Sequence, residues 1–145
     1  MTYKDVLNDL FDLLDRHKMI KTWGYGPLSD IVLPTDKHST DYPYAFIQPT
    51  NHQFTKGQMA YRFNLIIMEY CDSDDHDIIQ AQSDCQQYIK DILGQLYYHY
   101  TEYDYKYNTQ IIPFQEKYND TVSGMTAQIE IIVKDRLDDC ISPFN

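Results

Sequence analysis

The sequence predicts an α+β domain in which two helices pack on one face of a mainly antiparallel sheet of four or more strands. In residues 3–18 and 78–98, apolar side chains recur every three or four positions, as in amphipathic helices. In residues 58–70 and 125–134, apolar side chains recur at every second position, as in strands. Helical and strand patterns therefore alternate along the chain, which is typical of this class.

The first helix is expected over residues 3–18. Thr2 precedes it as a capping residue, with Asp5 three positions later, a pair resembling a capping box. One stripe of the helix is apolar and faces the core. It consists of Tyr3, Val6, Leu7, Leu10, Phe11, Leu13 and Leu14.

Short strands are expected at residues 19–23 and 44–48, the second limited to about five residues by a proline at each end. Residues 51–57 form a turn, so strands 44–48 and 58–70 make an antiparallel hairpin with a long loop. The second half of strand 58–70 is apolar on both faces, which predicts cover on both sides.

A second helix to about Tyr98 begins within the acidic cluster Asp72–Asp77, whose charge suits a helix N-terminus. Tyrosines alternate with charged residues in 103–107, and 111–115 continues this strand pattern. A turn over 118–124 then leads to the strand at 125–134.

The sheet face away from the helices is expected to be polar or to meet a partner. It carries Arg62 and Asn64 from one strand, and Gln128 and Glu130 from another.

The 145-residue chain lacks repeats and Gly/Ser linkers, so we expect one domain at residues 1–134 and a C-terminal extension at 135–145.

Lys and Arg total 12 against 22 Asp and Glu, a net charge of −10. This balance argues against nucleic-acid-binding and membrane-adhering proteins. Without an apolar leader and with three widely spaced cysteines, the sequence favours a protein made in a reducing compartment.

Motifs for catalysis or cofactors are missing from the sequence. It contains no GxxxxGK[ST], GxGxxG, GxSxG, HxH or HExxH pattern. The cluster Asp72–Asp77 fails the EF-hand test, because position six is Asp77 and position twelve is Ser83. A solvated helix start is the simpler interpretation. We expect no enzyme, no metal and no cofactor, although a Cys and a His brought together from distant segments stay an open alternative.

Tyrosine is unusually frequent, with 14 copies against 6 of phenylalanine, and it suits half-buried and partner-facing surfaces. A lineage preference for tyrosine is an equal alternative. If the chain assembles into an obligate ring, Glu in place of Tyr103 or Tyr105 should break that assembly and leave the subunit folded. In the tail, an apolar docking arm and a disordered terminus are equally open. The candidate contact residues are Tyr97, Tyr100, Tyr103, Tyr105, Tyr107, Arg136, Leu137, Ile141 and Phe144.

The order of helix, hairpin, long helix and final hairpin resembles the tail-terminator, tail-completion and neck-ring proteins of tailed bacteriophages. Residues 42–48, 58–69, 78–98 and 125–134 carry this resemblance. The closing stretch 131–139, a strand followed by acidic residues, looks like endings common in structural proteins of gut phages, including crAss-like ones.

The resemblance implies a virion protein, made in the bacterial cytoplasm, that forms a homo-oligomeric ring as a head–tail connector or tail terminator. Its neighbours would be portal, neck or tail proteins. DNA would pass through the ring without sequence-specific binding, and an acidic lumen would repel its phosphates. The alternative is a small acidic cytoplasmic adaptor domain that binds other proteins.

Overall fold

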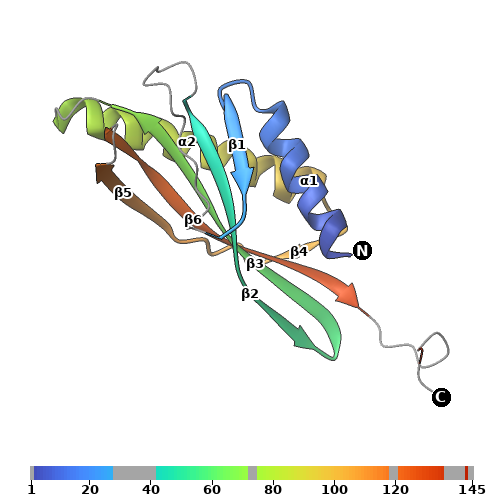
Figure 1. Cartoon of the computed structure of the whole chain (residues 1–145). Coiled ribbons are helices and arrows are strands. Elements are labelled where there is room, and N and C mark those ends of the chain that lie inside the picture. Colours follow the sequence, from blue (N-terminus) through green and yellow to red (C-terminus); the bar gives the residue numbers. More distant parts are fainter. Residues whose placement is uncertain (1, 28–41, 72–74, 118–120, 136–142, 144–145) are drawn as a thin grey trace.

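The computed structural model describes residues 2–27, 42–71, 75–117, 121–135 and 143. These residues form two helices and six strands (Figure 1). In chain order they are α1 (Tyr3–Arg16), β1 (Thr22–Tyr25), β2 (Tyr44–Thr55), β3 (Gly57–Tyr70), α2 (Asp75–His99), β4 (Asp104–Tyr105), β5 (Ile111–Lys117) and β6 (Thr121–Asp135).

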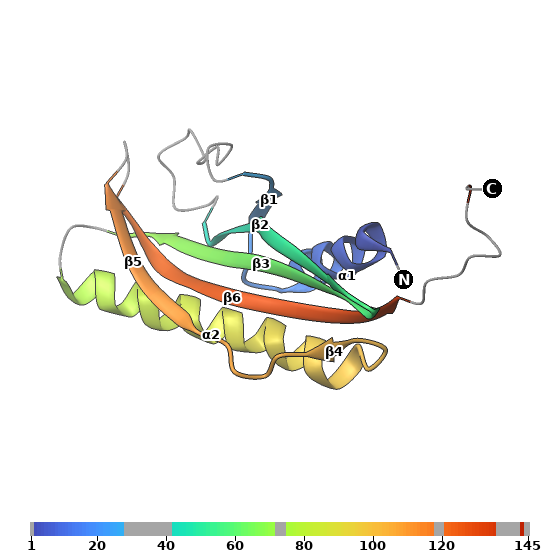
Figure 2. The ribbon, with the colours of Figure 1, turned by 90° about the horizontal axis from the view of Figure 1, so that it is seen from below.

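The strands form one sheet in the order β1-β2-β3-β6-β4, and β5 also pairs with β6. Only the pairing of β1 with β2 is parallel among these described strands. The α+β class and the mainly antiparallel sheet are therefore confirmed. Figure 2 shows the curvature of the sheet and α2 running along it beneath β5 and β6.

Helix α1 starts as predicted, with a reciprocal capping box. The Asp5 amide donates to Thr2 Oγ1 at 3.2 Å, and the Thr2 amide donates to Asp5 Oδ2 at 2.7 Å. The helix ends at Arg16, two residues earlier than predicted, because His17 adopts an extended conformation as the C-cap. Its buried residues all belong to the predicted apolar stripe: Val6, Leu7, Leu10, Leu13 and Leu14.

Strand β2 corrects the prediction of a five-residue strand and a long loop. It continues through Pro49 to Thr55, and the hairpin turns at Lys56 and Gly57, where Gly57 has a φ of 86°. Pairing with β1 ends at Ile47, so beyond this point β2 is an edge strand, which tolerates a proline without a backbone N–H. A register shift between Pro49 and His52 accommodates the irregularity.

Strand β6 corrects the predicted turn over residues 118–124. Residues 118–120 lie outside the described residues, and the strand already includes Ser123 and Gly124. Gly124 pairs with Met68 of β3. A β-carbon at this glycine would lie 1.9 Å from the carbonyl oxygen of Ile67, so the two strands approach closely only because residue 124 has no side chain.

The main core cluster contains buried residues of α1 and α2 together with alternate residues of β3 and β6. The fully buried members include Phe63, Ile67, Ile89 and Ile131. A second cluster, with Phe46, Ile66 and Met68, lies on the opposite face. The second half of β3 is thus buried on both faces, as predicted.

Candidate functional site

A polar groove with a volume of about 530 Å³ lies on the second face of the sheet. Its floor comes from β3 and β6, and its sides come from β2 and from the segment between β4 and β5. The polar residues that line it are Thr50, Asn51, Arg62, Asn64, Lys106, Asn108, Gln110, Gln128 and Glu130.

The floor of the polar groove follows from strand pairing. Arg62 lies directly opposite Glu130 in the β3–β6 ladder, and Asn64 lies opposite Gln128. Side chains two residues apart in a strand point to the same face. The four residues predicted for the polar face are therefore brought together by the structure.

One side of the groove is a break in the edge of the sheet. Tyr105 pairs with Ile131 and Ile111 pairs with Ala127, so five residues (106–110) lie opposite three residues of β6 (128–130). The Lys106 amide donates to the Glu130 carbonyl at 3.4 Å, and the Gln128 amide donates to the Gln110 carbonyl at 3.1 Å. This excess of two residues positions Lys106, Asn108 and Gln110 at the groove.

Hydrogen bonds hold part of the groove in place. Arg62 Nη2 lies 2.7 Å from Gln53 Oε1 and 3.1 Å from Glu130 Oε1, and Asn64 Nδ2 donates to Gln48 Oε1 at 3.1 Å. The charged residues that line the groove are Arg62, Lys106 and Glu130. Together they carry one net positive charge, whereas the whole chain has a net charge of −10. Among the residues described, Lys106 has no ion-pair partner. The groove offers amide groups and one net positive charge to a polar or acidic chain.

Two predicted contact tyrosines belong to the chain's own core. Tyr103 and Tyr105 are 3% and 8% exposed. The Tyr103 hydroxyl donates to the Asp9 carboxylate, and the Tyr105 hydroxyl donates to the carbonyls of Leu96 and Tyr100 at 3.0 and 2.6 Å. Burial, followed by the bond to Asp9, raises the pKa of Tyr103 above its ordinary value. A glutamate at either position would be a buried charge, so this structure leads us to expect that such a variant unfolds.

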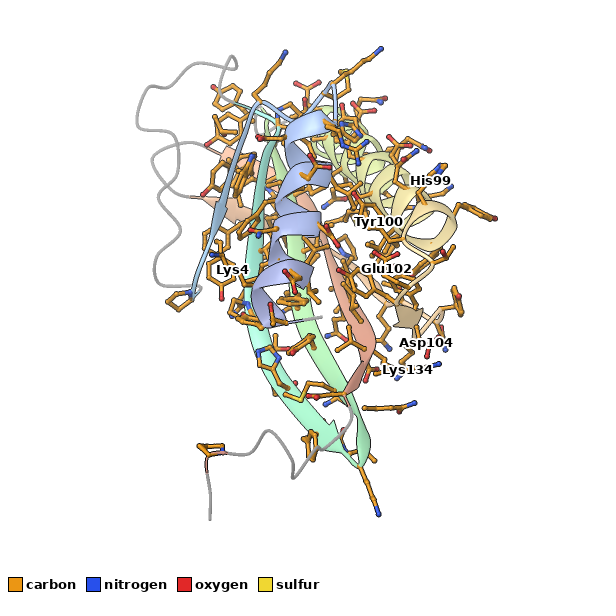
Figure 3. All side chains as sticks on the ribbon, turned by 90° about the vertical axis from the view of Figure 1, so that its right-hand side faces the viewer. Lys4, His99, Tyr100, Glu102, Asp104 and Lys134 are labelled. Atoms are coloured by element: carbon orange, nitrogen blue, oxygen red, sulfur yellow. The ribbon has the colours of Figure 1, made fainter. Side chains whose placement is uncertain are left out.

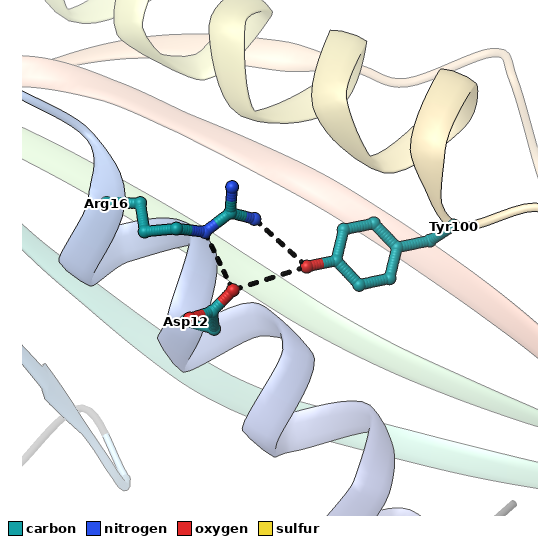
Figure 4. A network of polar contacts seen from close by, with 3 residues as sticks. All are labelled: Asp12, Arg16 and Tyr100. Atoms are coloured by element: carbon teal, nitrogen blue, oxygen red, sulfur yellow. Dashed lines mark hydrogen bonds and ion pairs between the residues drawn. The ribbon is translucent and has the colours of Figure 1, made fainter.

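Tyr100 connects the end of α2 to α1 (Figure 4). Arg16 Nη2 donates to its hydroxyl at 3.1 Å, and the hydroxyl lies 3.4 Å from Asp12 Oδ2, which Arg16 Nε also contacts at 2.8 Å. Figure 3 shows this end of the molecule, where His99 and Glu102 flank Tyr100 in the chain. Tyr100 is half-buried, and its hydroxyl serves an intramolecular network.

Of the five predicted tyrosines, Tyr107 is the most accessible, with 69% of its surface exposed. Its ring lies 4.9 Å from that of half-buried Tyr97. The four predicted tail residues, Arg136, Leu137, Ile141 and Phe144, lie outside the described residues.

Exposed large apolar side chains lie at both ends of the strand order and also elsewhere, at Phe54 of β2 and Ile79 of α2. Met19 and Tyr25 lie before and within β1, at one end of the strand order. At the other end, Tyr107 and Ile112 lie between β4 and β5 and in β5, and Tyr98 of neighbouring α2 is 81% exposed. Sequence reasoning missed Met19, Tyr98 and Ile112, since their spacing within the chain carries no signal of exposure.

A smaller acidic hollow, of about 230 Å³, lies beside the start of α2 and includes Glu69, Asp77 and Asp84. One oxygen of Glu69, Oε2, is buried without a hydrogen-bond partner. Burial and then the charge of Asp84 raise the pKa of Glu69.

In the predicted acidic cluster, residues 72–74 lie outside the described residues. The described residues, those of the acidic hollow included, contain no group of three or more His, Cys, Asp or Glu side chains placed to hold a metal ion.

No protein-family model matches this chain, and no curated protein matches its sequence. Neither helix in the described part of the chain has the length and apolar character needed to cross a membrane.

Proposed function

We propose that this protein is a non-catalytic structural subunit that forms an oligomeric ring in the neck or tail of a tailed bacteriophage. It would act as a head–tail connector or tail terminator around the DNA channel. The observation that carries the ring is the presence of exposed apolar side chains near opposite ends of the sheet, at Met19 and Tyr25 and at Tyr107 and Ile112.

A closed ring is built from a heterologous contact, in which one surface of a subunit binds a different surface of the next. Such a subunit needs two unlike patches on well-separated sides, whereas a two-fold dimer needs only one. We assign these two patches to the exposed side chains at the β1 end and to those at the β5 end. In β5, Pro113 lacks a backbone N–H, so contact through side chains is favoured over extension of the sheet.

Two further observations support the phage setting. Helix α1, the β2–β3 hairpin, helix α2 and the β5–β6 hairpin follow one another in the order on which the resemblance rests. The chain has a net charge of −10, and an acidic channel wall would let DNA slide without binding.

The second candidate function is a small acidic adaptor domain that binds another protein. The polar groove favours it, because a hollow lined by amides and one net positive charge fits an extended peptide. An adaptor would work as a monomer or dimer, so oligomeric size separates the two candidates.

The test is light scattering on the purified protein across a concentration series, with negative-stain images of the same samples. The proposal predicts closed rings of one size, for instance six or twelve copies. A double variant, Tyr107→Glu with Ile112→Glu, should reduce them to folded monomers, because two exposed apolar side chains would become charged at one patch. Gln86→Glu, an exposed charge change on α2, is the matched control and should leave the rings intact.

A monomer at every concentration, with the same mass in the double variant, would contradict the ring and favour the adaptor. Circular dichroism on the double variant shows that any loss of rings is not a loss of folding.

A further inference from the structure

We propose that the polar groove is the docking site for residues 136–142 of a second copy of this chain. The inference rests on the proposed function, since it assigns one of the contacts that would join neighbouring subunits. The occupant is an extended, acidic peptide segment, and the partner is the chain itself.

The hydrogen-bonding groups of the groove suit the backbone of an extended segment. Side chains of Asn108, Gln110 and Gln128 are exposed, and each amide offers donors and an acceptor. A peptide backbone presents donors and acceptors in alternation along its length, so it can use both. The hollow of about 530 Å³ falls within the size range of binding clefts.

The charges of groove and segment are complementary. Arg62, Lys106 and Glu130 sum to +1, and Lys106 has no ion-pair partner in the described part of the chain. The segment contains Arg136 together with Asp138 and Asp139, a sum of −1. Opposite charges of this kind guide association and set register more than they add affinity.

The direction of β6 favours a second copy over the same chain. Gln128 and Glu130 lie in the groove, and from there the strand runs to Asp135, which pairs with Gly57 at the tip of the β2–β3 hairpin. The described strand thus ends beside this hairpin tip, five residues past Glu130, and the same chain would have to reverse direction to return to the groove. Pro143, the one residue beyond Asp135 that the structure describes, is exposed.

The experiment uses the native thiol at Cys140 and a new thiol in the groove. In the full-length chain, Gln128→Cys replaces an exposed side chain, and the two described cysteines, Cys71 and Cys85, are buried. Mild oxidation should then give a ladder of disulfide-linked dimers and larger species on a non-reducing gel. Adding Cys140→Ser should abolish the ladder.

Two matched controls test position and charge. Lys90→Cys puts the new thiol on the exposed side of α2 and should give no ladder. In the Gln128→Cys chain, Lys106→Glu should slow ladder formation about fivefold, whereas Lys18→Glu, an exposed charge reversal after α1, should not.

A disulfide within one chain, seen as a faster-moving monomer, would overturn the inference, and so would the absence of any disulfide involving residue 128. Light scattering on the untreated protein measures its oligomeric size and so tests the proposed ring separately. Rings without a ladder would overturn this docking contact and leave the ring standing. A ladder without rings would support the contact and overturn the ring.

Discussion

At the scale of single residues, the tyrosines after α2 show how one residue type serves different purposes. Tyr103 and Tyr107 are four positions apart, yet the first is 3% exposed and the second 69%. A phenol combines a large apolar ring with one polar atom, so it is stable in a core when that atom finds a partner. Tyr103 finds the Asp9 carboxylate on α1, which makes it a connection between the chain's two helical regions.

Substitution at Tyr103 is expected to weaken folding. Tyr103→Phe removes a hydrogen bond to a charged group, which should lower the free energy of unfolding by about 1.5–3 kcal/mol. Tyr103→Glu places a carboxylate in the core near Asp9 and should leave the chain unfolded. Urea titration followed by circular dichroism measures both.

The matched control is Tyr107→Phe, which should change the free energy of unfolding by less than about 0.5 kcal/mol because the residue is exposed. Equal destabilisation by the two Phe variants would contradict the role assigned to the Tyr103 hydroxyl.

At the scale of elements, the contact between β3 and β6 depends on the absence of a side chain at Gly124. The strands pair continuously from Gly57 with Asp135 to Tyr70 with Val122. At Gly124 the backbone of Ile67 occupies the space that a β-carbon would need. At Gly94, in the interior of α2, the same added group would meet no atom within 4 Å beyond its chain neighbours and the nearby backbone of its own helix.

These two glycines predict opposite effects of alanine. Gly124→Ala forces the central strands apart and should lower the free energy of unfolding by at least about 3 kcal/mol. Gly94→Ala should raise it by about 0.5–1 kcal/mol, since alanine favours the helix and restricts the unfolded chain. Denaturant titrations of both variants provide the comparison, and a mild effect at Gly124 would argue against the close approach of β3 and β6.

At the scale of the whole molecule, several buried or partly buried phenols bind their protons more tightly in the folded state. Burial is the largest cause for Tyr3, Tyr88, Tyr103 and Tyr105, and it raises the pKa of Tyr88 to about 12. In the unfolded chain a tyrosine loses its proton near pH 10. Above that pH the folded state therefore holds more protons than the unfolded state, and stability falls as pH rises.

The melting temperature should consequently decrease between pH 10 and 12, the window set by Tyr88. Each such tyrosine contributes a slope of up to about 1.4 kcal/mol per pH unit within its window. Tyr88→Phe should make the decrease shallower, and Tyr107→Phe should not. Scanning calorimetry of the three proteins measures this, and identical slopes would contradict the assignment to Tyr88.

Local patterns were sufficient for several elements. The apolar stripe and the Thr2–Asp5 pair predicted α1, and alternation predicted β3 and most of β6. These features depend on neighbours three, four or two positions away, so the sequence carries their full signal. The polar character of Arg62, Asn64, Gln128 and Glu130 was readable for the same reason.

The sequence by itself thus determined the α+β class, the helix faces and the polar side of the sheet. Tertiary structure decided the remainder. The continuation of β2 past Pro49 depends on where β1 stops, the extra residues at 106–110 depend on pairing with β6, and the burial of Tyr103 depends on Asp9 of a distant helix. Each outcome is set by a partner far away in the chain, and a local pattern does not encode the distance to such a partner.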